Sequence, residues 1–513
     1  MFASTAALLS RAQATRVLAG LVLLAALVRF GTLDAKGFWG DELSTINLAH
    51  RSLGGALAGV ARLESTPPLY YVVAWSWAKL VPTTEVGARA ISALCVVALV
   101  PVAYAAAREL ASTRAAAVTA ALVACNPLLV WYSEEARSYS LVALLSAVAL
   151  LFFLRALRRR RPRDYAGWAL ASSLALATHY FAVLLVLPQA IVLARGRGSR
   201  RARALAVGTV AGAGALLLPL ALHQRSLGHA TWIGHSSLLG RVASTPLQFL
   251  VGFDLTPGAR PLGAVVLAAA VVGIGLAWRS ASRAQPTPAL LARLVVAGVA
   301  LPVGLALLGL DYLDSRNLIP LLVPVLIVLA AGFAAPGRSR LGSAAAVVFC
   351  ASSLAVVGLT AWEPKYHSED WRAAAGELGA ARVNRLVVAT PGQAARKPLE
   401  FYLPGSQKLL RQSRPAGEVD VLALPTQGHT RPAPLPGFSS GGFRLVARDR
   451  DGRFVLWRYR SARELWISPD VVRSPAATSA RPVVIWQRSS SSARPPEPVR
   501  LASRGRATGR TPP

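Results

Sequence analysis

The sequence predicts an α-helical polytopic membrane protein that carries a small α/β domain near its C-terminal end. Hydrophobic residues make up 54% of the 513 residues. Apolar runs such as RVLAGLVLLAALVRF at 16–30 and NLIPLLVPVLIVLAAGF at 317–333 approach the roughly 20 residues that span a bilayer core. From about residue 362 the composition changes to that of a soluble domain.

The basic residues indicate how the chain is oriented in the membrane. A net charge of +32 would suggest nucleic acid binding in a soluble protein, but here Arg clusters in short segments between apolar runs. Examples are RALRRRRPRD at 155–164 and ARGRGSRRARA at 194–204. Such clusters mark cytoplasmic turns. The partner they indicate is therefore the lipid bilayer, and we expect no nucleic acid partner.

We expect about 11–13 transmembrane helices. Candidate crossings lie at about 14–30, 87–108, 115–132, 139–157, 164–179, 180–195, 204–222, 261–278, 291–310, 317–335 and 341–361. The run PPLYYVVAWSWAKLV at 67–81 either crosses fully or dips into the membrane and returns. The three cysteines, Cys95, Cys125 and Cys350, fall inside apolar segments, which supports neither a disulfide framework nor a zinc site.

With the Arg clusters in the cytoplasm, nearly every polar cluster of the membrane region falls on the opposite, external face. The external segments are then 31–66, 133–138, the turn at 178–180, 223–260, 311–316 and everything after 362. A transport pathway would instead place ionisable residues near the bilayer midplane.

We predict three regions along the chain. Residues 1–361 form a multi-pass membrane domain with an external first loop at 31–66, 362–465 form an external α/β domain, and 466–513 form a disordered basic tail. In the second region, EDWRAAAGELGAARV at 369–383 reads as a helix, and RLVVAT at 385–390 and VDVLAL at 419–424 read as buried strands. A hairpin is predicted around Asp451 and Gly452.

Two external clusters carry groups that could perform chemistry. KGFWGDELS at 36–44 places Asp41 and Glu42 just beyond the first apolar run. LLVWYSEEARSYSL at 128–141 places Glu134, Glu135 and Arg137 between two helices. Taken alone, the first cluster is equally a solvated loop beside an interfacial Trp, and the second is equally a helix cap with a local ion pair.

The ordered set of motifs resembles a family, the GT-C membrane glycosyltransferases of the family 39 type. These are related to protein O-mannosyltransferases and to the aminoarabinose transferase of lipid A. The matching segments are FWGDELS (38–44), ESTPPLYY (64–71), SEEARSYSL (133–141), THYFAVLLVLPQ (178–189) and DSRNLIPLLVPVLIVLAAG (314–332). The resemblance covers about residues 16–404 and implies a GT-C type fold.

The resemblance implies a plasma-membrane enzyme that transfers a mannose-like sugar from a polyprenyl-phosphate carrier. The acceptor would be a lipid, a glycan or a protein on the non-cytoplasmic face. By this resemblance Asp41 is the general base toward the acceptor, with Glu42 as its partner. Arg137 and Arg316 are the candidates for stabilising the phosphate leaving group, and both should face one external pocket.

Further candidates lie around this core. Glu64 stands where relatives often place an acidic residue, whereas Thr66 and Asn317 replace the His and Tyr that relatives often have there. Glu134 and Glu135 bind the acceptor, a metal or only Arg137. His179 and Tyr180, at an external turn, are substrate-binding residues or simply satisfied interfacial ones. No cofactor is certain; a divalent metal is possible because family members differ in metal dependence.

Two alternatives belong to other functional classes. A transporter or flippase for a lipid-linked intermediate predicts charged residues at helix centres, where this sequence has almost none. A non-catalytic membrane scaffold predicts that the acidic and Arg clusters serve only stability.

Overall fold

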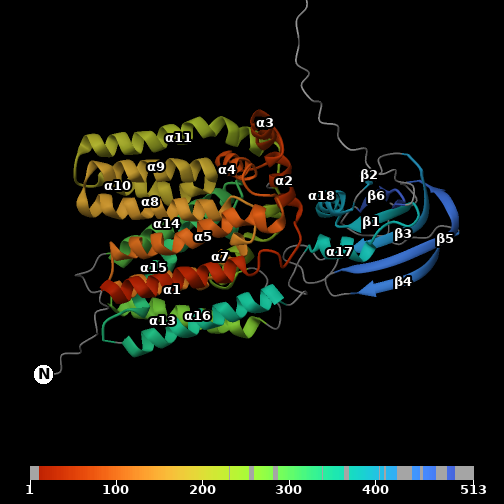
Figure 1. Cartoon of the computed structure of the whole chain (residues 1–513). Coiled ribbons are helices and arrows are strands. Elements are labelled where there is room, and N and C mark those ends of the chain that lie inside the picture. The colour runs from red at the N-terminus through yellow and green to blue at the C-terminus, as the bar shows by residue number, and fades with distance from the viewer. Residues whose placement is uncertain are drawn as a thin grey trace, which may run out of the picture. The chain divides into compact units, whose positions relative to one another are not determined.

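A computed structural model of the chain describes most of its residues (Figure 1). The described residues are 11–229, 231–252, 259–280, 287–337, 339–362, 369–403, 405–408, 412–424, 442–450, 454–468 and 482–490. They divide into two compact units: unit 1 holds Met1–Asp370, and unit 2 starts at Trp371.

Unit 1 is entirely helical in its described part. Its α-helices are α1 (Arg11–Phe30), α2 (Gly40–Ala49), α3 (Leu53–Leu63), α4 (Leu69–Trp77), α5 (Glu85–Arg108), α6 (Thr113–Cys125), α7 (Pro127–Ser133), α8 (Tyr139–Arg159), α9 (Pro162–Thr178), α10 (Val183–Arg195), α11 (Arg200–Ser226), α12 (Leu238–Val251), α13 (Arg260–Ser280), α14 (Thr287–Leu307), α15 (Leu322–Phe333) and α16 (Ser339–Trp362). Three 3₁₀ helices join them: η1 (Tyr180–Ala182), η2 (Thr231–His235) and η3 (Ser315–Leu321). The long helices run side by side as a bundle (Figure 1).

Eight helices of the described chain are long and apolar enough to cross a membrane, or nine if the bent pair of α6 and α7 forms one span. The predicted crossings at 164–179 and 180–195 correspond to the shorter α9 and to η1 with α10. The run at 67–81 contains only α4, whose nine residues extend roughly 14 Å. Because a bilayer core is about 30 Å thick, this segment does not cross it.

The break between α6 and α7, a bend of 52°, has a local cause in the sequence. Pro127 has no N–H, so the carbonyl of Val123 loses its helical donor. Arg29, fully buried at the end of α1, donates to the carbonyl oxygens of Val123 at 3.2 Å and Ala124 at 3.0 Å. The Asn126 side chain caps the new helix by accepting from the backbone N–H of Leu129 at 3.0 Å. The backbone carbonyls at the end of α6 and a backbone N–H at the start of α7 thus both have hydrogen-bond partners.

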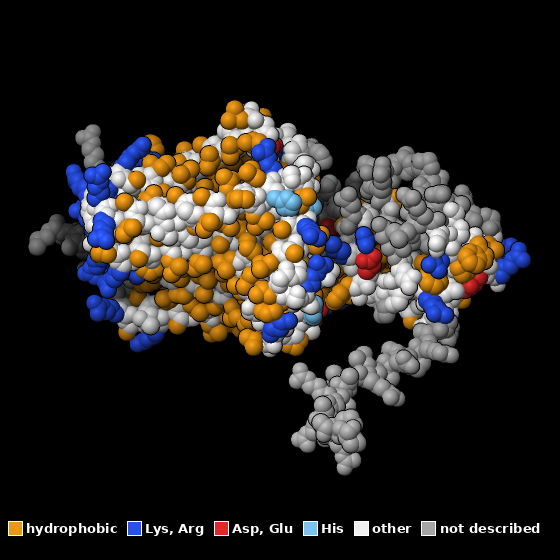
Figure 2. All heavy atoms as spheres, turned by 90° about the horizontal axis from the view of Figure 1, so that it is seen from above, with side chains coloured by type: hydrophobic (Ala, Val, Ile, Leu, Met, Phe, Trp, Pro, Cys, Tyr) orange, Lys and Arg blue, Asp and Glu red, His pale blue; other side chains and the backbone are white. Residues whose placement is uncertain are grey.

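One end of the bundle is strongly basic. Helices α5, α8, α10 and α13 each have Arg in their last turn, and α11 begins with Arg. At this end the buried Glu109 carboxylate pairs with Arg155, Arg158 and Arg159. In Figure 2 Lys and Arg side chains are densest at one end of unit 1, beyond a band in which hydrophobic side chains are abundant, and further Lys and Arg side chains lie toward the other end. The opposite ends of α5, α8, α9 and α11 carry the segments that form the candidate site.

Unit 2 contains a six-stranded sheet with the strand order β2-β6-β1-β3-β5-β4. The strands are β1 (Arg385–Thr390), β2 (Ser406–Lys408), β3 (Arg414–Ala423), β4 (Arg444–Arg450), β5 (Val455–Ile467) and β6 (Val483–Gln487), with helices α17 (Trp371–Leu378) and α18 (Gly392–Tyr402). Strands β1 and β3 are parallel, and the other neighbours are antiparallel. Apolar side chains of β1, β3 and α17 are buried in the core.

The predicted strand at 385–390 is confirmed as β1, and the predicted hairpin is confirmed by the antiparallel pairing of β4 with β5. Its turn residues, Asp451 and Gly452, lie outside the described residues. The prediction of disorder from 466 onward is wrong for two segments: β5 continues to Ile467, and 483–487 form β6 between β2 and β1. The cause is the run VVIW, whose β-branched and aromatic side chains favour a buried strand. Residues 491–513 lie outside the described residues.

Candidate functional site

Helix α2 presents the two adjacent carboxylates of the first loop in different environments. Its N-cap is Trp39, and Glu42 reaches back to accept from the Trp39 backbone N–H at 3.4 Å. The Asp41 side chain is 47% exposed, whereas that of Glu42 is fully buried. Both charges lie in the first turn of the helix, where they are favoured by its dipole.

Glu42 is held by Arg89, which lies near the start of α5. The Arg89 Nε and Nη2 atoms donate to the two Glu42 carboxylate oxygens at 2.8 and 2.7 Å. The other guanidinium N–H groups donate to the carbonyls of Leu33, Lys36 and Gly37. The backbone N–H of Ala136 also donates to Glu42, at 2.9 Å.

Every face of the Glu42 carboxylate is therefore occupied by protein donors. It joins the first loop to α5 and to the segment between α7 and α8. We assign Glu42 a positioning role in place of the predicted catalytic one. Removing either partner of this fully buried pair would leave an unpaired charge, which typically costs about 3–5 kcal/mol.

Arg137 brings three sequence motifs together. Its Nη1 donates to Glu64 Oε2 at 3.0 Å and to the Tyr71 hydroxyl at 3.2 Å, and its Nη2 lies 3.9 Å from Asp41 Oδ2. The Tyr71 hydroxyl donates to the same Glu64 oxygen at 2.6 Å. The Arg137 Nε is buried and has no hydrogen-bond partner in the described structure. The guanidinium thus joins Asp41 of the first loop to the ESTPPLYY motif.

The surroundings of Arg137 and Tyr71 keep both side chains protonated. Burial lowers the pKa of Arg137, but the carboxylates of Glu64 and Asp41 outweigh it and hold that pKa well above its usual value. Burial raises the pKa of Tyr71 well above its usual range, so its hydroxyl stays protonated as a donor. Thr66, which stands where relatives often have His, instead shares a 3.1 Å hydrogen bond with this hydroxyl.

Arg316 lies at the start of η3, in the turn that follows α14. The Asp314 side chain caps this turn by accepting from the Arg316 backbone N–H at 3.1 Å, and Asp314 Oδ1 lies 3.4 Å from Arg316 Nε. The guanidinium stacks on Trp232, 4.5 Å from the ring centroid. No hydrogen bond from the guanidinium to any described residue is found. Its charge also interacts with that of Asp41, more weakly than with that of Asp314.

His179 is buried at the end of α9. Burial, together with the charges of Arg316 and Arg137, lowers the pKa of His179 to about 3. The imidazole is therefore neutral at physiological pH. Its ring centroid is 5.6 Å from those of Tyr139 and Phe181. A neutral, stacked imidazole can hydrogen-bond a substrate but carries no proton to release.

Tyr180, the neighbour of His179, contacts a different part of the protein. Its hydroxyl donates to Gln224 Oε1 at 2.8 Å, and Gln224 Nε2 donates to the carbonyls of Val60 and Thr66. This chain links η1, α11 and the end of α3. Tyr180 therefore supports the loop that bears Glu64.

Glu134 and Glu135 are both buried and point to different partners. Glu134 accepts from the Thr32 hydroxyl and lies 4.0 Å from Lys36 Nζ. Glu135 accepts from the indole N–H of Trp131 at 2.8 Å, and burial raises its pKa to about 7. Neither carboxylate contacts Arg137 directly, so the predicted pairing of these residues with Arg137 is not formed.

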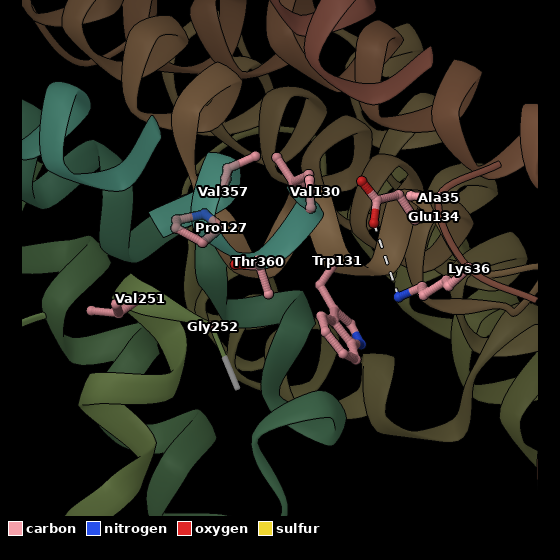
Figure 3. A pocket seen from close by; sticks show the side chains of 11 residues that line it. Ala35, Lys36, Pro127, Val130, Trp131, Glu134, Val251, Gly252, Val357 and Thr360 are labelled. Atoms are coloured by element: carbon pink, nitrogen blue, oxygen red, sulfur yellow. Dashed lines mark ion pairs between the residues drawn. The ribbon is translucent and has the colours of Figure 1, made fainter. Parts of the chain in front are cut away.

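A recess lies beside Glu134 (Figure 3). Its cavity volume is about 30 Å³, which has room for about two hydroxyl groups or waters. Its lining comes from the first loop, α7, the end of α12 and the end of α16: Ala35, Lys36, Pro127, Val130, Trp131, Glu134, Val251, Gly252, Val357, Thr360 and Ala361. In Figure 3, Lys36 and Glu134 face each other on one side, and Val251, Val357 and Thr360 lie on the other.

The described residues do not assemble a metal centre from the candidate carboxylates. No group of three or more His, Cys, Asp or Glu side chains in the described part of the chain is placed to hold an ion. Glu64 is engaged by Arg137 and Tyr71, and Glu134 by Thr32 and Lys36.

Sequence reasoning missed three residues of the site: Arg89, Tyr71 and Lys36. A signal existed for Arg89, because a charged residue in the first turns of an apolar helix needs a buried partner. Tyr71 lies in the ESTPPLYY motif and Lys36 in the KGFWGDELS motif, but their contacts join segments that are distant in sequence.

Asn317, where relatives usually have Tyr, donates to the Tyr312 carbonyl at 2.8 Å.

Comparisons with known proteins agree with this architecture. Residues 65–223 match the sequence model of a family described as dolichyl-phosphate-mannose-protein mannosyltransferase. The structure resembles ArnT from Cupriavidus metallidurans bound to undecaprenyl phosphate, with 15% identity and a TM-score of 0.51 over 86% of this chain and 98% of that chain. The chain has the GT-C fold. It resembles the family 39 type within that fold.

Two further solved structures are similar. ArnT from Cupriavidus metallidurans in the apo state gives 15% identity and a TM-score of 0.51 over 87% of this GT-C chain and 98% of that chain. The Archaeoglobus fulgidus oligosaccharyltransferase in the apo form gives 12% identity and a TM-score of 0.48 over 71% of this chain, which spans only 58% of that protein. A comparison with curated protein sequences gives no match.

Proposed function

We propose that this GT-C protein transfers a mannose-like sugar from a polyprenyl-phosphate carrier to a lipid, glycan or protein acceptor on the non-cytoplasmic face. One observation carries the proposal: a half-exposed Asp41 carboxylate lies 3.9 Å from the buried Arg137 and interacts with Arg316. The proposed base thus lies beside one buried cation and within the electrostatic influence of a second.

The proposed reaction is a single displacement at the anomeric carbon. The acceptor hydroxyl oxygen forms the new bond to this carbon, and its proton passes to Asp41. The bond between the anomeric carbon and the phosphate oxygen breaks, and its electron pair leaves with the lipid phosphate. A positioned carboxylate base contributes about 10²–10⁴-fold in rate. One displacement inverts the configuration of the sugar.

The leaving phosphate needs cations more than it needs a proton. Arg316 suits this role because its guanidinium makes no hydrogen bond to the described residues and is oriented by Asp314 and Trp232. Arg137 offers its unpartnered Nε. The neutral His179 can hydrogen-bond the sugar or the phosphate.

The named relatives support the carrier class. The matched family model is described by dolichyl-phosphate-mannose, and one similar structure is that of ArnT bound to undecaprenyl phosphate. Both carriers are polyprenyl phosphates, and the family description supports mannose as the sugar to test first.

The distribution of Arg supports the proposed side of the membrane. The basic ends of α5, α8 and α10 lie at the end of the bundle opposite the site. Basic ends face the cytoplasm, so the site faces the other side. Helix α16 starts at the basic end and finishes at Trp362. We therefore place unit 2, which follows it in the chain, on the non-cytoplasmic side as well.

The test compares sugar transfer by wild type and Asp41→Asn. Membranes containing each full-length protein are incubated with radiolabelled polyprenyl-phosphate mannose, and the lipid, glycan and protein fractions are extracted. We expect Asp41→Asn to reduce product formation by about 10²–10⁴-fold at equal expression, because it removes the base. The labelled fraction identifies the acceptor class.

The matched control is Asp34→Asn, an exposed carboxylate in the same loop, which should retain wild-type activity. Equal product from wild type and Asp41→Asn would remove Asp41 from the chemistry. Movement of the intact labelled lipid across the membrane without transfer would favour the flippase alternative.

A further inference from the structure

The recess beside Glu134 contains a polar pair whose hydrogen-bonding capacity is mostly unused. The Lys36 ammonium lies 3.9 Å from the Trp131 ring centroid and 4.0 Å from Glu134 Oε2, and its side chain is only 13% exposed. At 4.0 Å it is too far from this oxygen for a hydrogen bond. No hydrogen bond from the ammonium to any described residue is found.

The Glu134 carboxylate also has hydrogen-bonding capacity that the described residues do not use. One of its oxygens accepts from the Thr32 hydroxyl, while the other has only the distant Lys36. A buried ammonium with three donors beside a carboxylate oxygen that accepts no hydrogen bond is costly unless a ligand or water completes the set. The recess thus offers donors and an acceptor side by side.

The charges of the recess select the kind of ligand. Lys36 and Glu134 are its only charged lining residues, so their formal charges cancel. An anionic group would meet the Glu134 carboxylate at close range. A hydroxyl group avoids this repulsion, because it accepts from the ammonium and donates to the carboxylate. Adjacent hydroxyls on a sugar ring present this combination.

The remaining walls of the recess are apolar. Val130 comes from α7, Val251 from the end of α12, and Val357 and Ala361 from α16. Helix α16 is one of the candidate membrane spans. In Figure 3 Val251 and Val357 lie on the side away from Lys36 and Glu134, with the Trp131 indole between them. The lining therefore suits a head group of hydroxyls attached to an apolar chain.

Along the chain, the recess is next to the proposed base. Glu134 is three residues from Arg137, whose Nη2 lies 3.9 Å from Asp41 Oδ2. Three residues span at most about 11 Å. Trp131 also donates to Glu135, and Ala136 donates to Glu42, so the recess wall and α2 share one short, hydrogen-bonded segment.

We propose that this recess is the acceptor subsite and binds the neutral, hydroxyl-bearing head group of a membrane-anchored glycolipid, with Lys36 and Glu134 hydrogen-bonding its hydroxyls. The assignment rests on the proposed glycosyltransferase function and selects the lipid-linked glycan among the possible acceptors. The donor phosphate stays with Arg316 and Arg137.

The test measures binding of a defined neutral glycoside to the full chain in nanodiscs. Radiolabelled n-octyl β-D-glucopyranoside, below its micellar concentration, is equilibrated with the protein, and empty nanodiscs give the lipid background. We expect Lys36→Met and Glu134→Gln each to weaken binding about tenfold. Lys79→Met is the matched control, since Lys79 lies 4.8 Å from the Trp75 ring centroid in an equivalent cation–π pair outside the recess lining. It should bind as wild type does.

Competition separates the ligand classes. Octanol and octyl phosphate should displace the glycoside poorly, because one lacks hydroxyls on a ring and the other is anionic. Equal binding by wild type, Lys36→Met and Glu134→Gln, or stronger competition by octyl phosphate, would overturn the assignment. Elution as a single species and an unchanged melting midpoint show that each variant is folded.

A second measurement keeps the two proposals apart. Undecaprenyl phosphate binding should be unchanged in Lys36→Met and reduced in Arg316→Gln. If sugar transfer occurs but the glycoside binds Lys36→Met as well as wild type, the acceptor assignment fails and the glycosyltransferase proposal stands. If the glycoside binds through Lys36 but no transfer is found from any polyprenyl-phosphate sugar, the glycosyltransferase proposal fails and the binding of a neutral head group in the recess stands.

Discussion

Asp41 and Glu42 are neighbours in the sequence and have opposite roles in the site. Successive residues of an α-helix point about 100° apart. This rotation directs Glu42 toward Arg89 inside the protein and Asp41 toward Arg137, with about half of the Asp41 side chain exposed. A base needs access to its substrate, and the more exposed of the two carboxylates has it. The buried one holds the loop in which the base acts.

The buried Glu135 carboxyl predicts how the stability of the protein depends on pH. Burial raises its pKa from the usual 4.5 to about 7. Because the folded-state pKa is raised, its contribution to stability is present below about pH 4.5 and is lost as the pH rises through 7. Glu135→Gln cannot ionise, so at pH 8 it should be more stable than wild type, by up to about 3 kcal/mol. At pH 4.5 the two should be nearly equal.

Thermal melting of both proteins in detergent at pH 4.5, 6 and 8 checks this prediction. Asp34→Asn, at an exposed carboxylate, is the control and should show no such divergence from wild type. A constant difference between wild type and Glu135→Gln at all three pH values would contradict the raised pKa.

At the scale of elements, the bend between α6 and α7 sets the position of the site segment. Helix α7 leads directly into residues 134–138, which carry Arg137 and the carboxylates of the recess. Arg29 satisfies the carbonyls that the bend exposes, and Asn126 Nδ2 donates to the Phe249 carbonyl at 3.0 Å, which joins the bend to α12. The direction of α7, and with it the placement of Arg137, depends on these contacts.

Arg29→Met should therefore destabilise the protein and reduce its activity together. The substitution leaves the buried carbonyls of Val123 and Ala124 without donors, at about 1–3 kcal/mol each. We expect the melting midpoint to fall by several degrees and sugar transfer to fall with it. Arg16→Met, on the exposed face of the same helix, is the matched control. Equal midpoints for the two variants would show that Arg29 does not support the bend.

Sequence patterns predicted most elements because their signals are local. Apolar length identified the long helices, and the β-branched run at 385–390 identified β1. The strand at 483–487 was missed because its apolar run is only four residues long and the residues around it are rich in Ser, Pro and Arg. Helix α4 was left undecided because its apolar composition resembles that of a span, whereas only the folded chain shows its length.

The site was predictable where residue type alone indicates chemistry. Asp41 and Glu64 both pair with Arg137 in the structure, whereas the roles of these residues and of His179 and Arg316 stay predictions. The pairing of Glu42 with Arg89, 47 residues apart, could not be read from the sequence because it depends on how α2 packs against α5. The same holds for Lys36, whose partners Trp131 and Glu134 are far from it in the chain.

At the scale of the whole molecule, unit 1 has two chemically different ends. One carries Arg in nearly every turn, and the other carries the carboxylates, aromatic side chains and paired guanidinium groups of the candidate site. An Arg-rich end resists transfer across the bilayer. The membrane thus fixes which compartment the proposed chemistry faces.

Cysteine labelling checks this orientation. Cys95, Cys125 and Cys350 are first replaced, and single cysteines are then introduced by Asp34→Cys in the first loop or Arg197→Cys in the turn between α10 and α11. In sealed right-side-out vesicles, a membrane-impermeant maleimide should label the Asp34 variant at once and the Arg197 variant only after permeabilisation. The reverse pattern would place the site in the cytoplasm.

Strand β6 makes unit 2 dependent on a segment that is synthesised after all the other strands of its sheet. It pairs with β1 on one side and β2 on the other, so the sheet lacks an inner member until residue 487 has left the ribosome. Membrane helices are inserted as they emerge, and domains generally fold from the N-terminus during synthesis. The bundle can therefore form while translation continues, whereas the sheet closes only at its end. A nonsense mutation shortly after residue 470 would leave the membrane half intact and the sheet divided.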